Sequence, residues 1–597
     1  MSLFSSLITA YQQLPEERRL KFGYANQKIS YCIILKDRGN DFDVMDLRQT
    51  QAKSTHSYPK VLPLPSSPSR TGKKLAPHFL WDNMVYLFGV DFNDKNKCFE
   101  LVKTDFGKRK HDEFKTKHLN FLSECEHIEI KAFCKFIRSW LPNKNQFQKL
   151  TNKIKSTEMV NCIFAHEDTY HDRFLHQNHE IEKLWSIKMN GWHDKTTKLG
   201  QSVCFLTGEH GPIEPTHPYI KGVWGTQSSG APLISFNLPP FKSYGRDQGD
   251  NVPISSHSAF SYSTALNAFL NDNTHKIRIG ETTVVFWSSC SNAKTSEEAV
   301  SIFSEFLNPR TEEEISDIKI KDKLQAIKRG DSLSNLELDD NIEFFVLGLS
   351  PNKSRIFVRF FWEGTFGHLI DNFRKYIAEI KVSESENNYS IMKIVTSLAV
   401  QNKRENIIPR LAGEFLDSIL SGKPYPLSLL TNSLIRIRAD GNISTPRVGV
   451  MKAILIRNLK REVPMTLNKD FSDRGYVLGR LFAAYEKIQG DALGNVNSSV
   501  KDKYFGLASA SPQQAFSTLM DGSQKHLSKI RKSKPGQAVN LEKLVGSIME
   551  LMAPDKDPIP ISLNLSEQAM FGIGYYHQRN DFFRKKESSI QTNEVSK

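Results

Sequence analysis

The sequence predicts an α+β protein, in which a mixed α/β N-terminal region with long loops is followed by a C-terminal α-helical bundle. Strand-like runs alternate with helix-like runs up to about residue 380, and only helical spacing follows from about residue 388. The 597 residues are enough for two to four domains of ordinary size. We therefore expect an N-terminal α+β domain over residues 1–380 and a helical domain over residues 388–597.

The first elements follow from the spacing of apolar residues. Residues 2–13 have helical spacing, and two strand-like runs at 29–35 and 42–47 flank a hairpin turn at 37–40. Residues 53–77 then break all periodicity, because prolines and cations interrupt every apolar run. This segment predicts a long loop with a stiff, extended entry and a basic tip.

Further elements of the N-terminal region are expected from helical spacing or from β-branched and aromatic runs. The expected helices are residues 121–141, 180–189, 262–270 and 366–380, and the expected strands are residues 282–289, 343–349 and 355–362. Residues 303–340 are richer in charge, so they predict a linker or an exposed helical insert.

The last third of the chain has apolar residues at helical spacing and no cysteine. The clearest repeats are Val477, Leu478, Leu481, Phe482, Tyr485 and Ile488, then Leu541, Leu544, Val545, Ile548 and Leu551, and less cleanly Ala569, Phe571, Ile573, Tyr575 and Tyr576. Because strand signals are absent there, we predict a helical bundle.

Residues 204–245 gather Gly, Pro, Ser, Thr and Asn around single aromatic residues. Such a composition cannot bury a continuous apolar face, so it predicts loops that are held by a scaffold. Long loops inside a folded domain are usually functional. The cations in or beside this run are Lys221, Lys242 and Arg246, and its glycines would let a ligand approach the backbone closely.

The composition favours a polyanionic partner. Lys and Arg outnumber Asp and Glu by 80 to 66, which gives a net charge of +14. This balance favours nucleic acid or an acidic membrane surface, and the alternative is a soluble protein that is basic without such a partner. The content of 39% hydrophobic and 10% aromatic residues predicts a folded core rather than disorder.

Three basic clusters are candidate phosphate contacts. The first is the loop over residues 53–74, and the second is residues 106–118. The third consists of Arg436, Arg438, Arg447, Lys452, Arg457, Lys460 and Arg461. This third cluster predicts a positive stripe along the helices that holds a single strand. The alternatives are a surface loop for the first cluster and solvated helix faces for the other two.

No motif in the sequence requires catalysis, a metal or a cofactor. The chain has no P-loop, zinc-protease or nucleophile-elbow motif. The spacing of His166, His171, His176 and His179 allows metal binding, but structural zinc sites usually add closely spaced thiolates. A polar helix face is therefore the preferred interpretation of these histidines.

The cysteines and the hydropathy pattern predict a cytoplasmic protein. The seven cysteines form no C-x-x-C pair, and the chain starts with no secretory segment, so we expect reduced thiols. No run of about eighteen apolar residues occurs, so we expect no membrane span.

The run over residues 204–245 and six further stretches together carry a resemblance that extends along the whole chain. The six are RTGKKLAPHFLWDN (70–83), TTVVFWSS (282–289), VRFFWEGTFGHLIDNFRKY (358–376), NIIPRLAGEFLDSILSGKPYPLSLL (406–430), MTLNKDFSDRGYVLGRLFAAYEKIQ (465–489) and FGIGYYHQRNDFF (571–583). The chain resembles the large subunit of the type I-C CRISPR Cascade, the RNA-guided surveillance complex of bacterial antiviral defence.

The resemblance implies a non-catalytic subunit of a ribonucleoprotein complex. Such a subunit recognises the protospacer-adjacent motif (PAM) in double-stranded DNA, starts unwinding and R-loop formation, and supports the displaced strand with its C-terminal helices. The implied partners are the guide crRNA, target double-stranded DNA, the displaced single strand, the Cascade backbone and small subunits, and a helicase-nuclease. The resemblance implies no cofactor and no membrane partner.

The resemblance also implies which residues bind DNA. The resemblance assigns motif recognition to Arg70, Thr71, Gly72, Lys73 and Lys74, and to Gln227, Ser228, Ser229, Gly230, Asn237, Ser243 and Tyr244. The charge pattern adds Arg246, Arg436, Arg438 and Arg457 as candidate nucleic-acid contacts. The first stretch departs from the commoner family form, which has Ser before the glycine and fewer lysines after it, so the bases of the motif stay open.

The family commonly makes a separate small subunit by translation from an internal start. Met465 lies where that start would fall, so residues 465–597 are a candidate small subunit. Two alternatives to the whole interpretation stay open. One is a nuclease or RNA-processing enzyme, and the other is a purely structural scaffold for the RNA end.

Overall fold

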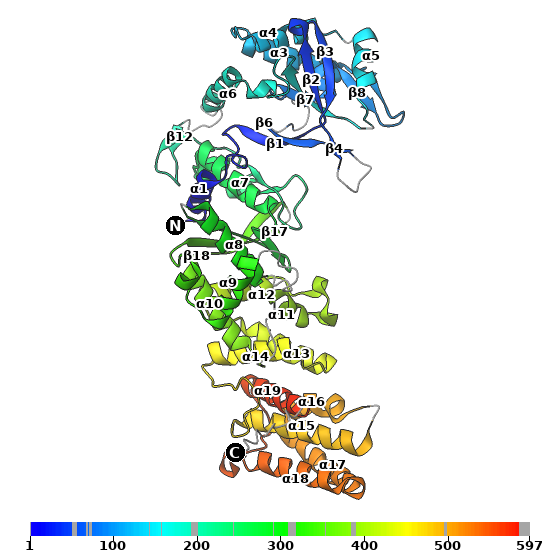
Figure 1. Ribbon diagram of the computed structural model, residues 1–597, viewed down its shortest axis with the longest axis vertical. Coiled ribbons are helices and arrows are strands. Elements are labelled where there is room, and N and C mark those ends of the chain that lie inside the picture. The colour runs from blue at the N-terminus through cyan, green and yellow to red at the C-terminus, as the bar shows by residue number, and fades with distance from the viewer. Residues whose placement is uncertain are drawn as a thin grey trace, which may run out of the picture. The chain divides into compact units, whose positions relative to one another are not determined.

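The computed structural model describes most of the chain (Figure 1). The residues outside the description are 1, 51–56, 67–69, 71–74, 142–143, 157, 193–200, 243, 291, 308–317, 353, 384–389, 495–497 and 584–597. Contacts divide the chain into two compact units. The N-terminal unit contains Leu7–Pro218 and Ile234–Ala265, and the C-terminal unit contains Met1–Ser6, Tyr219–Leu233 and Leu266–Lys597.

The expected boundary at residues 380–388 does not divide these two units. One apolar core runs from Ile279 to Tyr576, so it includes both the second large sheet and the helices that follow it. The sheet and the helices therefore share a core, and the chain divides earlier, between Ala265 and Leu266.

The N-terminal unit is built on a mixed sheet of four strands in the order β3-β2-β10-β7. These strands are β2 (Tyr31–Lys36), β3 (Asp41–Asp46), β7 (Trp81–Asn83) and β10 (Asn161–His166). β10 is parallel to β2, and the other pairings are antiparallel. Helix α4 (Ile128–Ser139) packs on β2 and β10, where Phe133 meets Phe164 with ring centroids 4.9 Å apart.

The hairpin expected near residues 29–47 is confirmed, because β2 and β3 pair around a turn at Asp37–Gly39. The extended loop expected over residues 53–77 is wrong in part. Lys60–Pro65 forms β6, which pairs with β1 (Tyr24–Ile29) in a separate two-stranded sheet. The two prolines of β6 are tolerated because each strand of such a ribbon has an outer edge where no amide partner is needed.

The other elements of this unit are short strands and helices around the sheet. The helices are most of α1 (Leu3–Gln13), α2 (Met84–Phe88), α3 (Asp105–Leu122), α5 (Lys144–Lys153), α6 (His179–Trp192) and the first part of α7 (Ser256–Asn271). The strands are β4 (Gln49–Thr50), β5 (Ser57–Tyr58), β8 (Val90–Asn93), β9 (Cys98–Leu101), β11 (Gln201–Val203) and β12 (His210–Pro212). The single helix expected at residues 121–141 was wrong, because α3 ends at Leu122 and α4 begins at Ile128.

The C-terminal unit contains an antiparallel sheet of four strands in sequential order. They are β15 (Lys276–Ile279), β16 (Thr282–Ser289), β17 (Glu343–Asn352) and β18 (Arg355–Thr365), so all three strands expected here are confirmed. The central pair is buried along most of its length because it is rich in β-branched and aromatic residues. A short hairpin of β13 (Tyr219–Ile220) and β14 (Ala231–Pro232) packs beside β18.

Helices make up the rest of this unit, and no strand follows Thr365 in the described residues. They are α8 (Ala293–Leu307), α9 (Ile318–Arg329), α10 (Phe366–Ile380), α11 (Ile391–Ser397), α12 (Leu411–Ser421), α13 (Leu427–Asp440), α14 (Thr445–Arg457), α15 (Arg474–Leu493), α16 (Val500–Ala510), α17 (Pro512–Ser533), α18 (Pro535–Met549) and α19 (Leu565–Asp581). The predicted helix at residues 366–380 and the helical C-terminal region are confirmed. In the charge-rich segment 303–340, the described part is largely helical.

Helices α15 and α19 approach each other closely because glycines lie where they meet. A Cβ atom added at Gly479 would lie 2.1 Å from the carbonyl oxygen of Phe571, and one added at Gly574 would lie 2.2 Å from that of Tyr476. Real side chains do not come so close to a backbone atom, so larger residues would push the two helices apart. The pair forms the centre of the last five helices.

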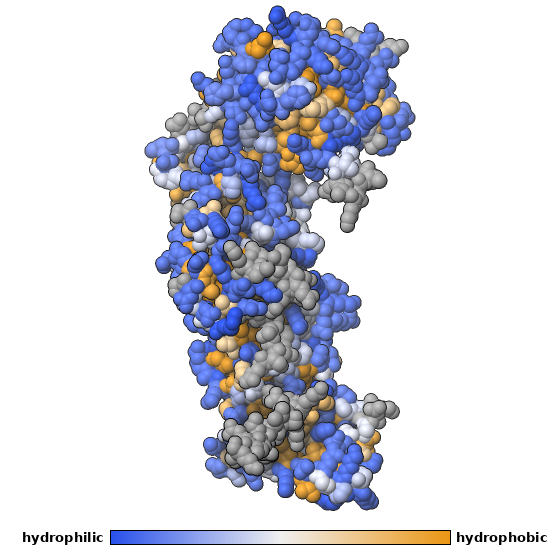
Figure 2. All heavy atoms as spheres, viewed as in Figure 1, coloured by the Kyte–Doolittle hydropathy of each residue, from blue (hydrophilic) through white to orange (hydrophobic). Residues whose placement is uncertain are grey.

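The α+β class is confirmed by the two four-stranded sheets and by the helical region after the second of them. Hydrophilic residues cover most of the face drawn in Figure 2. Across the described residues, no helix is both long enough and apolar enough to span a bilayer.

Candidate nucleic-acid interface

Arg70 is held at the base of the predicted basic loop. Its guanidinium pairs with the buried carboxylate of Asp82, and its Nε donates a hydrogen bond to the carbonyl oxygen of Ala76 at 2.8 Å. The same group lies 4.0 Å from the centroid of the Tyr86 ring. The side chain is only 25% exposed, and these contacts hold Arg70 in place. The other predicted residues of the loop, Thr71, Gly72, Lys73 and Lys74, lie outside the described residues, as does Ser243.

The predicted residues of the run over residues 204–245, which we call the glycine-punctuated run, fall into different units. Gln227, Ser228 and Ser229 are exposed in the loop between β13 and β14, which belongs to the C-terminal unit. Gly230 closes that loop at φ +86°, and its amide donates to the carbonyl oxygen of Gln227 at 2.9 Å. An added Cβ atom there would lie 2.5 Å from the carbonyl oxygen of Ile220, so this position requires glycine.

Three further predicted residues, Asn237, Tyr244 and Arg246, are exposed in the N-terminal unit. Tyr244 is fully exposed and has a positive φ of 50°, which is uncommon for a side chain of this size. An aromatic ring in contact with solvent on every side is available for stacking on a base.

The loop between β13 and β14 has one feature that the sequence did not indicate. The Trp224 ring is 56% exposed, and the Arg278 guanidinium of β15 lies 3.5 Å from its centroid. The Trp224 amide donates to Oγ1 of Thr283 at 3.0 Å, which fixes the backbone beside the ring. The only local signal was a single aromatic residue in a glycine-rich run, and the partner arginine lies far away in the sequence.

Arg457 lies in the interior of the C-terminal unit. Its guanidinium pairs with Glu379 at 2.8 Å and donates to the carbonyl oxygen of Ser418 at 2.9 Å. It also stacks over Tyr425, 4.0 Å from the ring centroid. The side chain is only 7% exposed, so Arg457 lies in the core. Its contacts there link α14 to α10 and α12.

Arg436 and Arg438 are neighbours on α13 and differ in exposure. Arg436 pairs with Asp440 at 3.0 Å, and its side chain is 16% exposed. Arg438 is exposed and donates to Oε1 of Gln568 on α19 at 2.5 Å. Of the three predicted arginines in the helices, Arg438 is therefore the most accessible to a ligand.

The predicted surface stripe is not formed by Arg447, Lys452 and Arg457, because all three are buried. Lys452 donates to the carbonyl oxygens of Ala378 and Glu379 at the end of α10, both at 3.2 Å. Burial lowers the pKa of Lys452 to about 8. These cations satisfy carbonyl and carboxylate oxygens of neighbouring helices, which the sequence pattern does not reveal.

Arg447 has a fully buried side chain that connects three elements. It makes two hydrogen bonds to the Asp440 carboxylate, at 2.6 and 2.8 Å. It also donates to the carbonyl oxygens of Ser397 at 2.8 Å and Asn442 at 2.7 Å. Burial alone would raise the pKa of Asp440, but the hydrogen bonds from Arg447 lower it to about 2.

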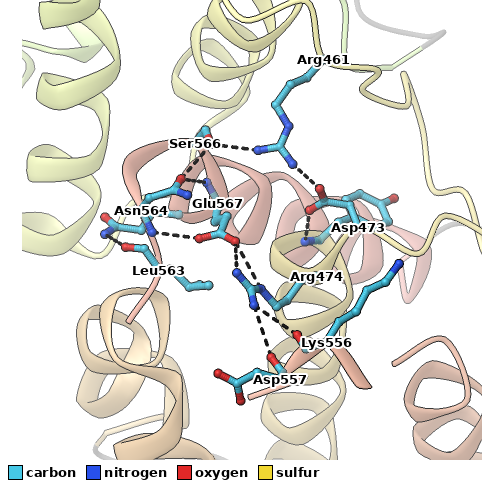
Figure 3. Close-up of polar contacts among 11 residues, drawn as sticks. Arg461, Asp473, Arg474, Lys556, Asp557, Leu563, Asn564, Ser566 and Glu567 are labelled. Carbon is cyan, nitrogen blue, oxygen red and sulfur yellow. Dashed lines mark hydrogen bonds and ion pairs between the residues drawn. The ribbon is translucent and has the colours of Figure 1, made fainter. Parts of the chain in front are cut away.

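Arg461 and Arg474 are also engaged within the unit, as Figure 3 shows. Arg461 bridges Asp473, the N-cap of α15, and Ser566 in the first turn of α19. Arg474 pairs with Glu567 and donates to the backbone that precedes α19. This network joins the starts of α15 and α19.

The predicted polar helix face of histidines is wrong. His166 ends β10, and His176 lies in the turn Leu175–Gln177, and both are buried. Burial lowers the pKa of His176 to about 4. Within the described part of the chain, no group of three or more His, Cys, Asp or Glu residues is arranged to hold a metal ion.

Comparison with known families places the chain. Residues 7–583 match the model of the family described as CRISPR-associated protein (Cas_Csd1), and the chain belongs to this family. No curated protein matches the chain. The family match confirms the resemblance to the large subunit of the type I-C CRISPR Cascade.

Arg447→Met is expected to destabilise the C-terminal unit by about 3 kcal/mol, because it leaves the buried carbonyl oxygens of Ser397 and Asn442 without their donor and removes one of the two arginine partners of Asp440. Arg436→Gln removes the more exposed partner of the same Asp440 and is expected to cost about 1 kcal/mol. Guanidinium unfolding followed by circular dichroism measures both values. Equal losses of unfolding free energy in the two variants would show that Arg447 stabilises the unit no more than the more exposed Arg436 does.

Proposed function

We propose that the chain is the non-catalytic large subunit of a type I-C Cascade, which recognises the PAM in double-stranded DNA and starts unwinding it beside the guide crRNA. The family match over residues 7–583 carries this proposal. The net charge of +14 supports contact with phosphates. Fidelity beyond the PAM would come from RNA–DNA pairing, so the protein needs to recognise only a few base pairs and follow the backbone.

In this proposal, Arg70 anchors the basic loop, and Thr71–Lys74 supply the contacts to the duplex. The support is the fixed position of Arg70 on Asp82 and Tyr86, since a loop that begins from a fixed point loses less entropy when it binds. Lys73 and Lys74 would neutralise phosphates, and Gly72 would permit close approach to a groove.

The exposed polar residues of the glycine-punctuated run are proposed as additional backbone contacts. Gln227, Ser228 and Ser229 carry donors that suit phosphate oxygens, and Gly230 fixes the loop that presents them. Asn237, Ser243, Tyr244 and Arg246 are proposed to contribute in the same way, with Tyr244 as the stacking residue. Arg436 and Arg438 are the proposed contacts on the helices, whereas Arg457 is buried among α10, α12 and α14 and is not proposed as a contact.

The proposed partners are the guide crRNA, the target duplex and its displaced strand, the Cascade backbone and small subunits, and a helicase-nuclease recruited after R-loop formation. We propose no cofactor. All seven cysteines are free thiols, which supports a location in the reducing cytoplasm.

Lys73→Ala combined with Lys74→Ala is expected to weaken binding to a PAM-bearing duplex and to flatten its salt dependence. Two lost phosphate contacts reduce the slope of log K against log salt concentration by about 2. Fluorescence anisotropy of the full chain with a labelled duplex, over a series of salt concentrations, measures both effects.

The matched control is Lys95→Ala combined with Lys97→Ala, which removes the same charge from an exposed turn between β8 and β9. This control is expected to keep the wild-type slope. An unchanged slope in the Lys73 and Lys74 variant would show that another part of the chain contacts the phosphates.

We propose that residues 465–597 are also made separately as a small subunit. The support is the packing of α15–α19 mainly on one another, with α15 in contact with each of α16, α17, α18 and α19. The polar network in Figure 3 would stay intact in this fragment except for Arg461, which precedes Met465.

Met465→Leu is expected to remove a short C-terminal product while the full chain is still made. Expression with a C-terminal tag, followed by immunoblotting and mass spectrometry of the tagged products, measures this. Met451→Leu, at an upstream methionine in α14, is the control and should leave the short product in place. A product of the same mass in the Met465→Leu strain would contradict the proposal.

A further inference from the structure

A pocket of about 640 Å³ lies within the C-terminal unit. It is lined by Arg278 of β15, by Lys393 and Ser397 of α11, by Asn402 and Arg404 in the segment before α12, and by Asn442 between α13 and α14. We call it the Arg278 pocket. Its volume is in the range of sites that hold a small organic ligand or a nucleotide.

The charged side chains among the described residues that line the Arg278 pocket are all cationic. No carboxylate is among the described residues that line it. Arg278 and Arg404 are exposed, and neither is paired with a carboxylate of the described residues. The Nε of Arg278 donates to the carbonyl oxygen of Gly280 at 2.8 Å, which leaves the other N–H groups for a ligand. The two guanidinium groups favour a phosphate, whose oxygens match the planar fork of arginine.

Buried contacts hold the floor of the pocket in place. Arg447 donates to the carbonyl oxygens of Ser397 and Asn442, and it lies 3.4 Å from Oδ1 of Asn402. Three lining residues are thus fixed by one side chain beneath them. Asn402 and its neighbour Gln401 have φ values of 54° and 58°, a backbone conformation that is retained mainly where the surroundings enforce it. A floor held in this way needs little ordering when a ligand binds.

Trp224 provides an aromatic surface at the same place. Arg278 lines the pocket and also stacks against the Trp224 ring, so the ring and the cations are adjacent. The ring is 56% exposed, although an indole normally buries most of its surface. A cationic pocket beside an open aromatic ring is the usual combination for single-stranded nucleic acid, where bases are free to stack. An acidic peptide would use the cations and would have no need of the ring.

We propose that the Arg278 pocket and Trp224 together bind one nucleotide unit of a single nucleic-acid strand, with its phosphate on the cations and the adjoining base on the indole ring. This proposal rests on the nucleic-acid-binding function proposed above. It assigns a single-strand site that lies entirely within the C-terminal unit and does not depend on the loop at residues 71–74.

The test uses the full chain and fluorescently labelled single strands of about ten nucleotides, as DNA and as RNA of the same sequence. Arg404→Gln is expected to reduce the slope of log K against log salt by about 0.7. Trp224→Leu is expected to weaken binding about tenfold with an unchanged slope, because it removes stacking and no charge. Lys543→Gln, an exposed lysine of α18 away from the pocket lining, is the control and should bind as wild type.

A second measurement reports contact directly. A strand that contains 5-iodouracil is irradiated on the protein, and the cross-linked peptide is identified by mass spectrometry. A cross-link in the peptide that carries Trp224 is expected, and it should disappear in Trp224→Leu.

The outcomes separate this proposal from the proposed function. A tighter complex with DNA supports the displaced strand as the ligand, and a tighter complex with RNA supports the guide. If the wild-type chain binds a PAM-bearing duplex but the pocket variants bind single strands as wild type does, the pocket proposal is overturned alone. If the wild-type chain binds neither duplex nor single strand, both proposals fail. Competition by a polyglutamate peptide that is lost in Arg404→Gln but kept in Trp224→Leu would overturn the assignment to nucleic acid.

Discussion

The ion pair between the buried Arg447 and the partly exposed Asp440 is the interaction on which the centre of the C-terminal unit depends. A guanidinium without solvent contact is costly unless its N–H groups find acceptors, and Arg447 finds them on Asp440, Ser397 and Asn442. These acceptors belong to α11, to the end of α13 and to the connection that leads into α14. One side chain therefore fixes three elements, and two of its backbone partners, Ser397 and Asn442, line the Arg278 pocket.

The need of a buried guanidinium for acceptors also distinguishes structural cations from cations that are available to a polyanion. Arg457 and Arg474 have carboxylate partners inside the unit, so they contribute little to the release of counterions from a nucleic acid. Arg278 and Arg404 are exposed beside a pocket without a carboxylate among its described lining residues. The net charge of +14 therefore does not locate the binding surface, because some of the 80 Lys and Arg side chains are engaged inside the fold.

Much of the fold was predictable from local sequence, and much of the site was not. The strand Thr282–Ser289 and the helix Phe366–Ile380 were predicted at their observed bounds, because their apolar spacing agrees with one structure only. The strand Lys60–Pro65 was missed, since its partner lies far earlier in the chain and its prolines suggested a loop. Burial of Arg457 and stacking of Trp224 on Arg278 depend on contacts between distant segments, which no local pattern specifies.

The proposed function requires that this chain open a DNA duplex beside the guide, with the guide RNA supplying the sequence. The direct test compares guide-loaded Cascade assembled with and without this subunit, on duplexes that carry 2-aminopurine in the first base pairs next to the PAM. The account predicts a rise in fluorescence only when both the subunit and the PAM are present. An assembly without the subunit that selects and unwinds its correct targets equally well would contradict the account.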